Sequence, residues 1–226
     1  MNGLDEDNRN AIADCCEVIR SRKFSCAGAK AALAGDALEF VLARDLRSGA
    51  DDTRIVEALH AFHSADTGDY KSLAILFPQT PALSEQKFER FLWQRLQALH
   101  VIDHERHPWD PAVSDDPASA SFGFSVGEQA FYVVGMHPAA SRMSRRMPFA
   151  VLAFNTHAQF RRLRANGKFA RMQSATRARD IALQGSPNPM LADHGVKSEA
   201  RQYSGRALAE QWVCPFQPRA NPGKTA

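Results

Sequence analysis

The chain alternates between segments whose apolar residues recur every three to four positions and short segments that are apolar throughout. The first kind predicts amphipathic helices. The clearest helix begins after Ser84, a typical N-cap residue. Its apolar stripe recurs at intervals of four, four and three, and consists of Phe88, Leu92, Leu96 and Leu99. Further helices are predicted over residues 8–20, 29–34, 52–63, 157–165, 168–183 and 206–211.

Five short apolar segments have the composition of strands. They are Leu38–Leu42, Leu73–Phe77, Phe122–Val126, Ala130–Met136 and Phe149–Phe154. The third and fourth are joined by Gly127-Glu128-Gln129, which favours a hairpin and therefore an antiparallel pair. We predict a single α/β domain over residues 1–216, with a mixed, mostly antiparallel sheet of about five strands flanked by helices. Residues 217–226 are rich in Pro, Gly and Lys and are expected to form a disordered tail.

Composition excludes several classes of protein. The 226 residues include 14 Phe and 3 Trp, which excludes extensive disorder. No apolar run approaches the roughly 20 residues of a membrane span, and the acidic N-terminus lacks the apolar region of a signal peptide, so we expect a cytoplasmic protein. The four cysteines form no Cys-x-x-Cys pair and are expected to be reduced. Dinucleotide-binding, Walker A and Gly-x-Ser-x-Gly motifs are absent, which disfavours the corresponding functions.

Charge is distributed unevenly along the chain. Residues 1–136 carry 13 Lys+Arg and 21 Asp+Glu, a net charge of −8, whereas residues 137–226 carry 15 and 4, a net charge of +11. The two parts can pair their charges with each other, or the basic part can form a pocket for anionic groups such as phosphates or propionates. Nucleic-acid binding is the least favoured interpretation, because the basic part lacks the repeated basic–aromatic pattern of RNA-binding platforms.

Three side chains are candidates for ligating a metal. His137 and His157 each follow a predicted strand, and strand ends that open into loops often carry functional residues. If the two strands are neighbours, both imidazoles can face one cleft, as iron ligands or as a general base. Cys214 precedes Pro215, and a thiolate in such a dipeptide can ligate haem iron, although a buried free thiol is the simpler interpretation.

A separate group of histidines lies at the end of the helix that follows Ser84. His100 and His104 are spaced i, i+4 and can share one helix face, with His107 three residues further on. Such a group can bind a non-haem metal, but a polar helix end that interacts with the helix dipole is the simpler explanation. Cys26, at a predicted helix start, is a candidate nucleophile without a supporting His–Asp arrangement beside it.

Taken together, several ordered segments between about residue 8 and residue 216 resemble the YqcI/YcgG family. They are Phe24-Ser25-Cys26, His107-Pro108-Trp109-Asp110-Pro111, the segments 131–142 and 154–160, Arg177-Ala178-Arg179-Asp180, the segments 185–193 and 198–205, and Trp212-Val213-Cys214-Pro215-Phe216. Within this family the chain is most similar to the haem-dependent N-hydroxylases of guanitoxin biosynthesis. The haem enzyme of the D-cycloserine pathway that hydroxylates arginine belongs to the same broad family. One departure is Ser25, where family members often carry Pro before the Cys.

The resemblance implies haem b as cofactor and N-hydroxylation of the guanidino group of arginine or an arginine-like small molecule. It further implies O₂ as the oxidant and a separate reductase as the electron donor. The anionic haem propionates would suit the basic loop that carries Arg142, Arg145 and Arg146. His137 is the first choice for the axial ligand of the iron, followed by His157 and Cys214.

A guanidinium substrate calls for a carboxylate that binds it through two hydrogen bonds. The candidates are Glu199, Asp193 and Asp110, all in predicted loops. Two alternatives of other classes stay open: a haem-binding or haem-sensing protein without turnover, and a nucleic-acid-binding module that uses the basic C-terminal half. A homodimer is expected only because closed homodimers are the commonest assembly in general.

Overall fold

The computed structural model describes residues 2–62, 69–186, 188–190 and 195–219. It contains a five-stranded sheet with the order β1-β2-β5-β4-β3. In chain order the strands are β1 (Leu38–Leu42), β2 (Ser72–Phe77), β3 (Phe124–Val126), β4 (Gln129–Met136) and β5 (Ala150–Thr156). Only β1 and β2 pair in parallel, and the other three pairs are antiparallel. The predicted mixed, mostly antiparallel α/β sheet is therefore confirmed.

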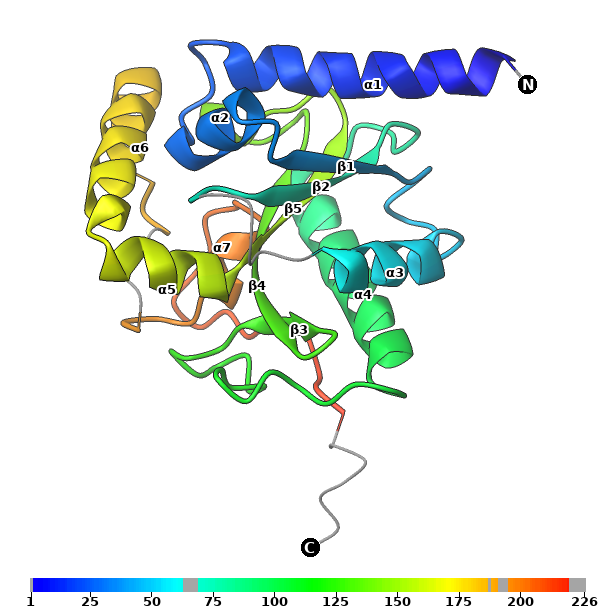
Figure 1. Ribbon diagram of the computed structural model, residues 1–226, viewed down its shortest axis with the longest axis vertical. Helices are drawn as coiled ribbons and strands as arrows, with labels where there is room; N and C mark the ends of the chain where they lie inside the picture. Colours follow the sequence, from blue (N-terminus) through cyan, green and yellow to red (C-terminus); the bar gives the residue numbers. More distant parts are fainter. Residues whose placement is uncertain (1, 63–68, 187, 191–194, 220–226) are drawn as a thin grey trace, which may run out of the picture.

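Helices cover both faces of this sheet (Figure 1). One face packs against α3 (Asp52–Ala61) and α4 (Glu85–Asp103), which bury the larger hydrophobic core. The other face packs against α1 (Asn2–Arg20) and α2 (Ala27–Ala34) over a smaller core. Beside α2 on this second face lie α5 (His157–Ala165) and α6 (Lys168–Gln184). Within the described residues, no helix combines the length and the apolar character needed to cross a membrane.

Helix α4 is set by its cap and by its apolar stripe. The Ser84 hydroxyl accepts a hydrogen bond from the Lys87 amide at 3.4 Å, as the sequence predicts for an N-cap. The stripe residues Phe88, Leu92, Leu96 and Leu99 are fully buried against the sheet. The close approach of α4 to β4 requires a glycine at position 135, because a Cβ there would lie 2.6 Å from Leu92 Cδ1 and 2.8 Å from Phe88 Cε1.

The C-terminal region differs from the sequence prediction. No helix forms over 206–211; a short helix, α7 (Ala200–Tyr203), lies just before it. The Arg201 guanidinium donates to the main-chain carbonyls of Ala209, at 2.6 Å, and Trp212, at 3.1 Å. The Ala209 carbonyl also accepts a hydrogen bond from the Trp212 amide at 3.1 Å, which is a turn contact three residues along the chain. In the predicted tail, Gln217 exchanges hydrogen bonds with Gln97 of α4, and residues 220–226 lie outside the described residues.

Loop 138–148 contains a 3₁₀ turn, η1 (Met143–Arg145), which the sequence does not predict. The remaining helices begin or end within a few residues of their predicted limits, apart from α1, which begins six residues earlier at Asn2. The predicted end of α3 at residue 63 lies outside the described residues, and its last described helical residue is Ala61.

Replacing Gly135 by alanine should lower the free energy of unfolding by about 1–3 kcal/mol, because the added methyl group overpacks the interface between β4 and α4. Urea denaturation measures this change. Gly35→Ala is the matched control, because a Cβ there meets only the Ala31 carbonyl oxygen, at 3.4 Å. Equal stability of the two variants would contradict the proposed packing constraint.

The stability of the fold should also decrease in acid through His100. Burial, and secondarily the charge of His104, lower the pKa of His100 to about 4. Since this lies below the roughly 6.5 of an exposed histidine, the unfolded state binds more protons, and up to about 3 kcal/mol is lost as the pH falls from about 6.5 to about 4. His100→Gln keeps an acceptor for the Arg219 amide and should show a weaker loss in urea denaturation; an identical pH dependence would contradict the assignment.

Candidate functional site

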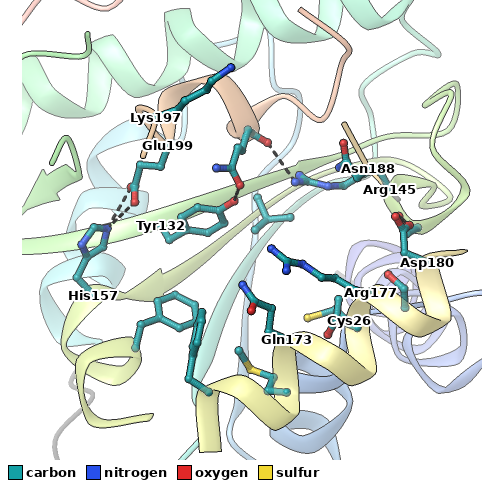
Figure 2. A pocket seen from close by; sticks show the side chains of 18 of the residues that line it. Cys26, Tyr132, Arg145, His157, Gln173, Arg177, Asp180, Asn188, Lys197 and Glu199 are labelled. Carbon is teal, nitrogen blue, oxygen red and sulfur yellow. Dashed lines mark hydrogen bonds and ion pairs between the residues drawn. The ribbon is translucent and has the colours of Figure 1, made fainter. Parts of the chain in front are cut away.

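A cavity of about 250 Å³ opens on the sheet face that carries α2, α5 and α6 (Figure 2). Its floor is β4, whose side chains alternate between the two faces of the sheet. Phe131 and Val133 point into the α3–α4 core, whereas Tyr132, Val134 and Met136 line the cavity. The alternation that makes β4 a strand therefore also assigns its even-numbered residues to the cavity.

Helix α6 forms a wall of the cavity with residues that recur every three to four positions. They are Phe169, Met172, Gln173, Thr176, Arg177 and Asp180. This spacing places them on one helix face. From α5, Phe160 and Arg164 complete the wall. The wall is mixed in character, with aromatic and methionine side chains beside guanidinium groups.

Cys26 contributes a thiol to the cavity wall. It is the N-cap of α2, and its Sγ accepts a hydrogen bond from the Ala29 amide at 3.4 Å. The next amide, that of Ala27, donates to Thr176 Oγ1 of α6 at 3.1 Å, which joins the start of α2 to the α6 wall. Amides at a helix N-terminus and the helix dipole stabilise a thiolate. In the described part of the chain, Cys26 is the only cysteine on this cavity.

A buried polar network lies at the α5 end of the cavity. The two carboxylate oxygens of Glu199 each lie 3.0 Å from His157 Nε2, and the Tyr203 hydroxyl donates a short hydrogen bond to Oε1. Burial raises the pKa of Glu199, while the hydrogen bonds and charge of His157 oppose this shift. Figure 2 shows His157 and Glu199 joined at the cavity wall. The pair can hold a proton between imidazole and carboxylate.

Beside this network, Tyr132 projects into the cavity from β4. Its hydroxyl donates to Gln202 Oε1 at 2.6 Å, and burial raises the pKa of this phenol well above its ordinary value. Both Tyr132 and Gln202 line the cavity. The floor therefore offers a fixed hydrogen-bonding group next to the His157–Glu199 pair.

Among the described residues, four Lys and Arg side chains line the cavity, namely Arg145, Arg164, Arg177 and Lys197. The Arg145 guanidinium is bound by main-chain carbonyls, at 2.9 Å from Gly135 O and 3.1 Å from Gln202 O. Arg164 lies over the Phe169 ring at 4.5 Å; burial lowers its pKa and the charge of Glu199 opposes this. All four belong to residues 137–226, so the basic part of the chain furnishes the cationic lining of the cavity, as the anion-pocket interpretation predicts.

Of the metal ligands expected from the sequence, only His157 lines the cavity. His137 is buried on the other side of β4, where its ring stacks on Phe88 with 4.3 Å between centroids. Its Nδ1 has no hydrogen-bond partner among the described residues. Cys214 packs against the α3–α4 core, and burial raises its pKa to about 12, which disfavours the thiolate that iron ligation needs. The structure does not bring these three side chains together.

The basic loop is used mainly within the protein. Arg142 forms a buried ion pair with Asp180 and donates to the Ser186 carbonyl at 2.9 Å. Arg146 donates to the Ala140 carbonyl at 2.7 Å and lies in a second groove beside α1. Only Arg145 of the three reaches the cavity, and its guanidinium is engaged as described above. That this loop binds propionates stays a prediction.

Of the three carboxylates predicted to bind the substrate, the structure places one at the cavity. Glu199 lines the cavity. Asp110 instead accepts hydrogen bonds from the amides of Ala112 and Ala130, both at 2.8 Å, and thereby fixes its own loop to β4. Asp193 lies outside the described residues. Cys26 was expected from the sequence only as a candidate nucleophile, and the cavity cations Arg164, Arg177 and Lys197 were not predicted as site residues. For Arg177, the helical spacing of the wall residues on α6 is a sequence signal that could have identified it.

Comparison with known proteins supports the resemblance found in the sequence. The model of the YqcI/YcgG family matches residues 15–217. An uncharacterized protein, YcgG of Bacillus subtilis (strain 168), is 29% identical over 205 residues, which cover 85% of this chain and 80% of that protein. No solved structure is significantly similar to the chain.

The four cysteines are free thiols, and the cavity should make them react unequally. Burial raises the pKa of Cys15 and Cys214 to about 12, which leaves about 10⁻⁴ of each as thiolate at pH 8. Burial also raises the pKa of Cys16. Iodoacetamide should therefore modify Cys26 first, as peptide mass spectrometry of timed samples would show. In Cys26→Ser this fast phase should be missing; faster labelling of Cys214 than of Cys26 would contradict the placement.

Proposed function

We propose that this chain, which belongs to the YqcI/YcgG family, binds haem b in the cavity and N-hydroxylates the guanidino group of arginine or an arginine-like small molecule. The observation that carries the proposal is the composition of the cavity wall. A thiol at a helix N-terminus and an imidazole–carboxylate pair face a space bordered by apolar side chains and cations.

The kinds of side chain that line the cavity suit the parts of a haem group. The macrocycle needs apolar contact surfaces, and Phe24, Val134, Met136, Phe160 and Met172 line the cavity. The propionates need cations, which Arg164, Arg177 and Lys197 offer. The iron needs an axial ligand, for which a thiolate or an imidazole is suitable.

Cys26 would hold the haem iron in this proposal. The Cys26 thiol lies on the cavity wall and accepts a hydrogen bond from the Ala29 amide, whereas His157 Nε2 is already held by Glu199. The thiolate role that the sequence suggested for Cys214 is therefore assigned to Cys26, and His137 loses its first place because it lies outside the cavity. When bound, the haem would supply the activation of O₂, with electrons from a separate reductase.

The protein's own groups would position the substrate. Two oxygens of one carboxylate can bind a guanidinium through paired hydrogen bonds, and Glu199 is a cavity carboxylate whose hydrogen bonds are with His157 and Tyr203. Asp180, the other acidic side chain of the wall, is held by Arg142 and Ser144. His157 Nε2, 3.0 Å from Glu199 Oε1, would hold that carboxylate in place at the cavity wall.

An absorption spectrum tests the cofactor. Protein made with ample haem should show a Soret band, and its reduced form with carbon monoxide should show the strongly red-shifted maximum of thiolate ligation. Cys26→Ser should remove the red shift, while Cys214→Ser, the matched control, should keep it. A histidine-type spectrum that disappears in His157→Gln would assign the iron to His157 instead, and a protein that stays haem-free would contradict the proposal.

The substrate is tested with the haem-loaded protein, arginine and a reductant, by mass spectrometry of the hydroxylated product. Glu199→Gln should lower kcat/KM by about 10- to 100-fold, because a charge-assisted hydrogen bond is worth about 1.5–3 kcal/mol. Its Soret band should persist. Glu210→Gln, at an exposed carboxylate outside the cavity lining, is the control. A haem protein that oxidises no guanidino compound would favour the haem-sensing alternative.

A further inference from the structure

We propose that His60, Asp103 and His107 bind one divalent first-row transition metal ion, with Zn²⁺ as the best-suited representative, at a site separate from the cavity. One ligand atom from each of the three side chains lies within 4.8 Å of the other two. His60 Nε2 lies 2.6 Å from Asp103 Oδ1, and His107 Nδ1 lies 3.1 Å from the same oxygen. The proposal is independent of haem binding.

The three residues converge because the C-terminal ends of α3 and α4 meet at the β3–β4 turn. His60 lies in the last turn of α3, and Asp103 is the last residue of α4. The His107 amide donates to the Asp103 carbonyl at 3.0 Å, which places His107 one helical turn beyond the carboxylate. The i, i+4 pair that faces the site is therefore Asp103 and His107, whereas the sequence suggested His100 and His104.

The β3–β4 turn fixes the carboxylate. The Gly127 amide donates to both oxygens of Asp103, at 3.0 and 3.1 Å. Gly127 has a φ of +60°, and a Cβ there would lie 2.8 Å from His60 Cδ2. A glycine is therefore required for this close approach between the turn and His60. The carboxylate is held in one orientation by a group that does not compete for the position between the two imidazoles.

A second observation points to a missing ligand. His107 Nδ1 is buried and has no hydrogen-bond partner among the described residues. Its 3.1 Å contact with Asp103 satisfies a distance but not hydrogen-bond geometry. A buried polar atom without a partner is costly. A metal ion between the His60 and His107 rings, whose centroids are 4.4 Å apart, would give this atom a partner and neutralise the buried Asp103 charge.

The donor set selects the kind of ion. Two imidazoles and one carboxylate suit Zn²⁺ and its first-row neighbours, whereas Ca²⁺ and Mg²⁺ prefer oxygen ligands alone. Metal–ligand bonds of about 2.0–2.2 Å with tetrahedral geometry require about 3.4 Å between ligand atoms. The two contacts of Asp103 Oδ1, at 2.6 and 3.1 Å, therefore need to lengthen by less than about 1 Å. Three protein ligands leave one position for water, and the His60 and His107 side chains, each 31% exposed, leave the site accessible.

The test is a ZnCl₂ titration of the tag-free, EDTA-treated full chain by calorimetry, with thermal unfolding as a second readout. We expect one Zn²⁺ per chain and a higher Tm with zinc, because an ion that binds only the folded state stabilises it. His107→Ala and His60→Ala should each weaken binding at least about tenfold and lose the Tm rise. Glu105→Gln, which changes an exposed carboxylate in the same turn, is the matched control and should bind like the wild type.

Two further measurements keep the outcome decisive. Circular dichroism checks that each variant is folded, and His107→Gln replaces either alanine variant that is not. His104→Gln tests the His100–His104–His107 set and should leave zinc binding unchanged. The proposal would be overturned by a wild type that binds no zinc and shows no Tm rise. It would equally be overturned by wild-type affinity in the His60 and His107 variants, or by a loss of binding in His104→Gln alone.

Discussion

A buried guanidinium, that of Arg145, organises the part of the molecule on which the cavity depends. It donates to Gly135 O at the end of β4 and to Gln202 O and Tyr203 O of α7. Burial lowers its pKa, and binding to several carbonyls compensates for the loss of water. These bonds hold the basic loop, the end of β4 and α7 against one another. Gln202 of α7 and its N-cap Glu199 reach the cavity because α7 is held there.

The same arrangement separates two environments on the two faces of β4. On the α4 face, aromatic rings and the Leu92–Leu96–Leu99 stripe form a continuous apolar core. On the cavity face, polar groups are satisfied by one another, as in the bonds of Tyr132 to Gln202 and of His157 to Glu199. Buried polar networks of this kind rigidify a site when every member is paired. The cavity is thus shaped by hydrogen bonds, whereas the opposite face is shaped by packing.

The sequence predicts most of the fold because the elements are encoded by local patterns. The five strands and the capped helix α4 follow from apolar periodicity, and the hairpin follows from Gly127-Glu128. The predicted helix over 206–211 does not form, and the Ala209 carbonyl of that segment is bound instead by the Arg201 guanidinium and, in a turn, by the Trp212 amide. The candidate site could be predicted less well from the sequence. Strand parity places His137 with Phe131 and Val133, away from the cavity, but Cys26 and Glu199 meet their neighbours only through contacts distant in sequence.

The way α6 is attached has a consequence for how the cavity can change. Six of its side chains line the cavity, yet Asp180 is its only buried residue within the described part of the chain. Substitutions along this helix therefore alter the shape and charge of the cavity while removing little from either hydrophobic core. β4 has no such freedom, since its other face is packed against α4 and its residue 135 admits no side chain. The ligand preference of this fold is thus adjustable from one wall, with the floor held constant.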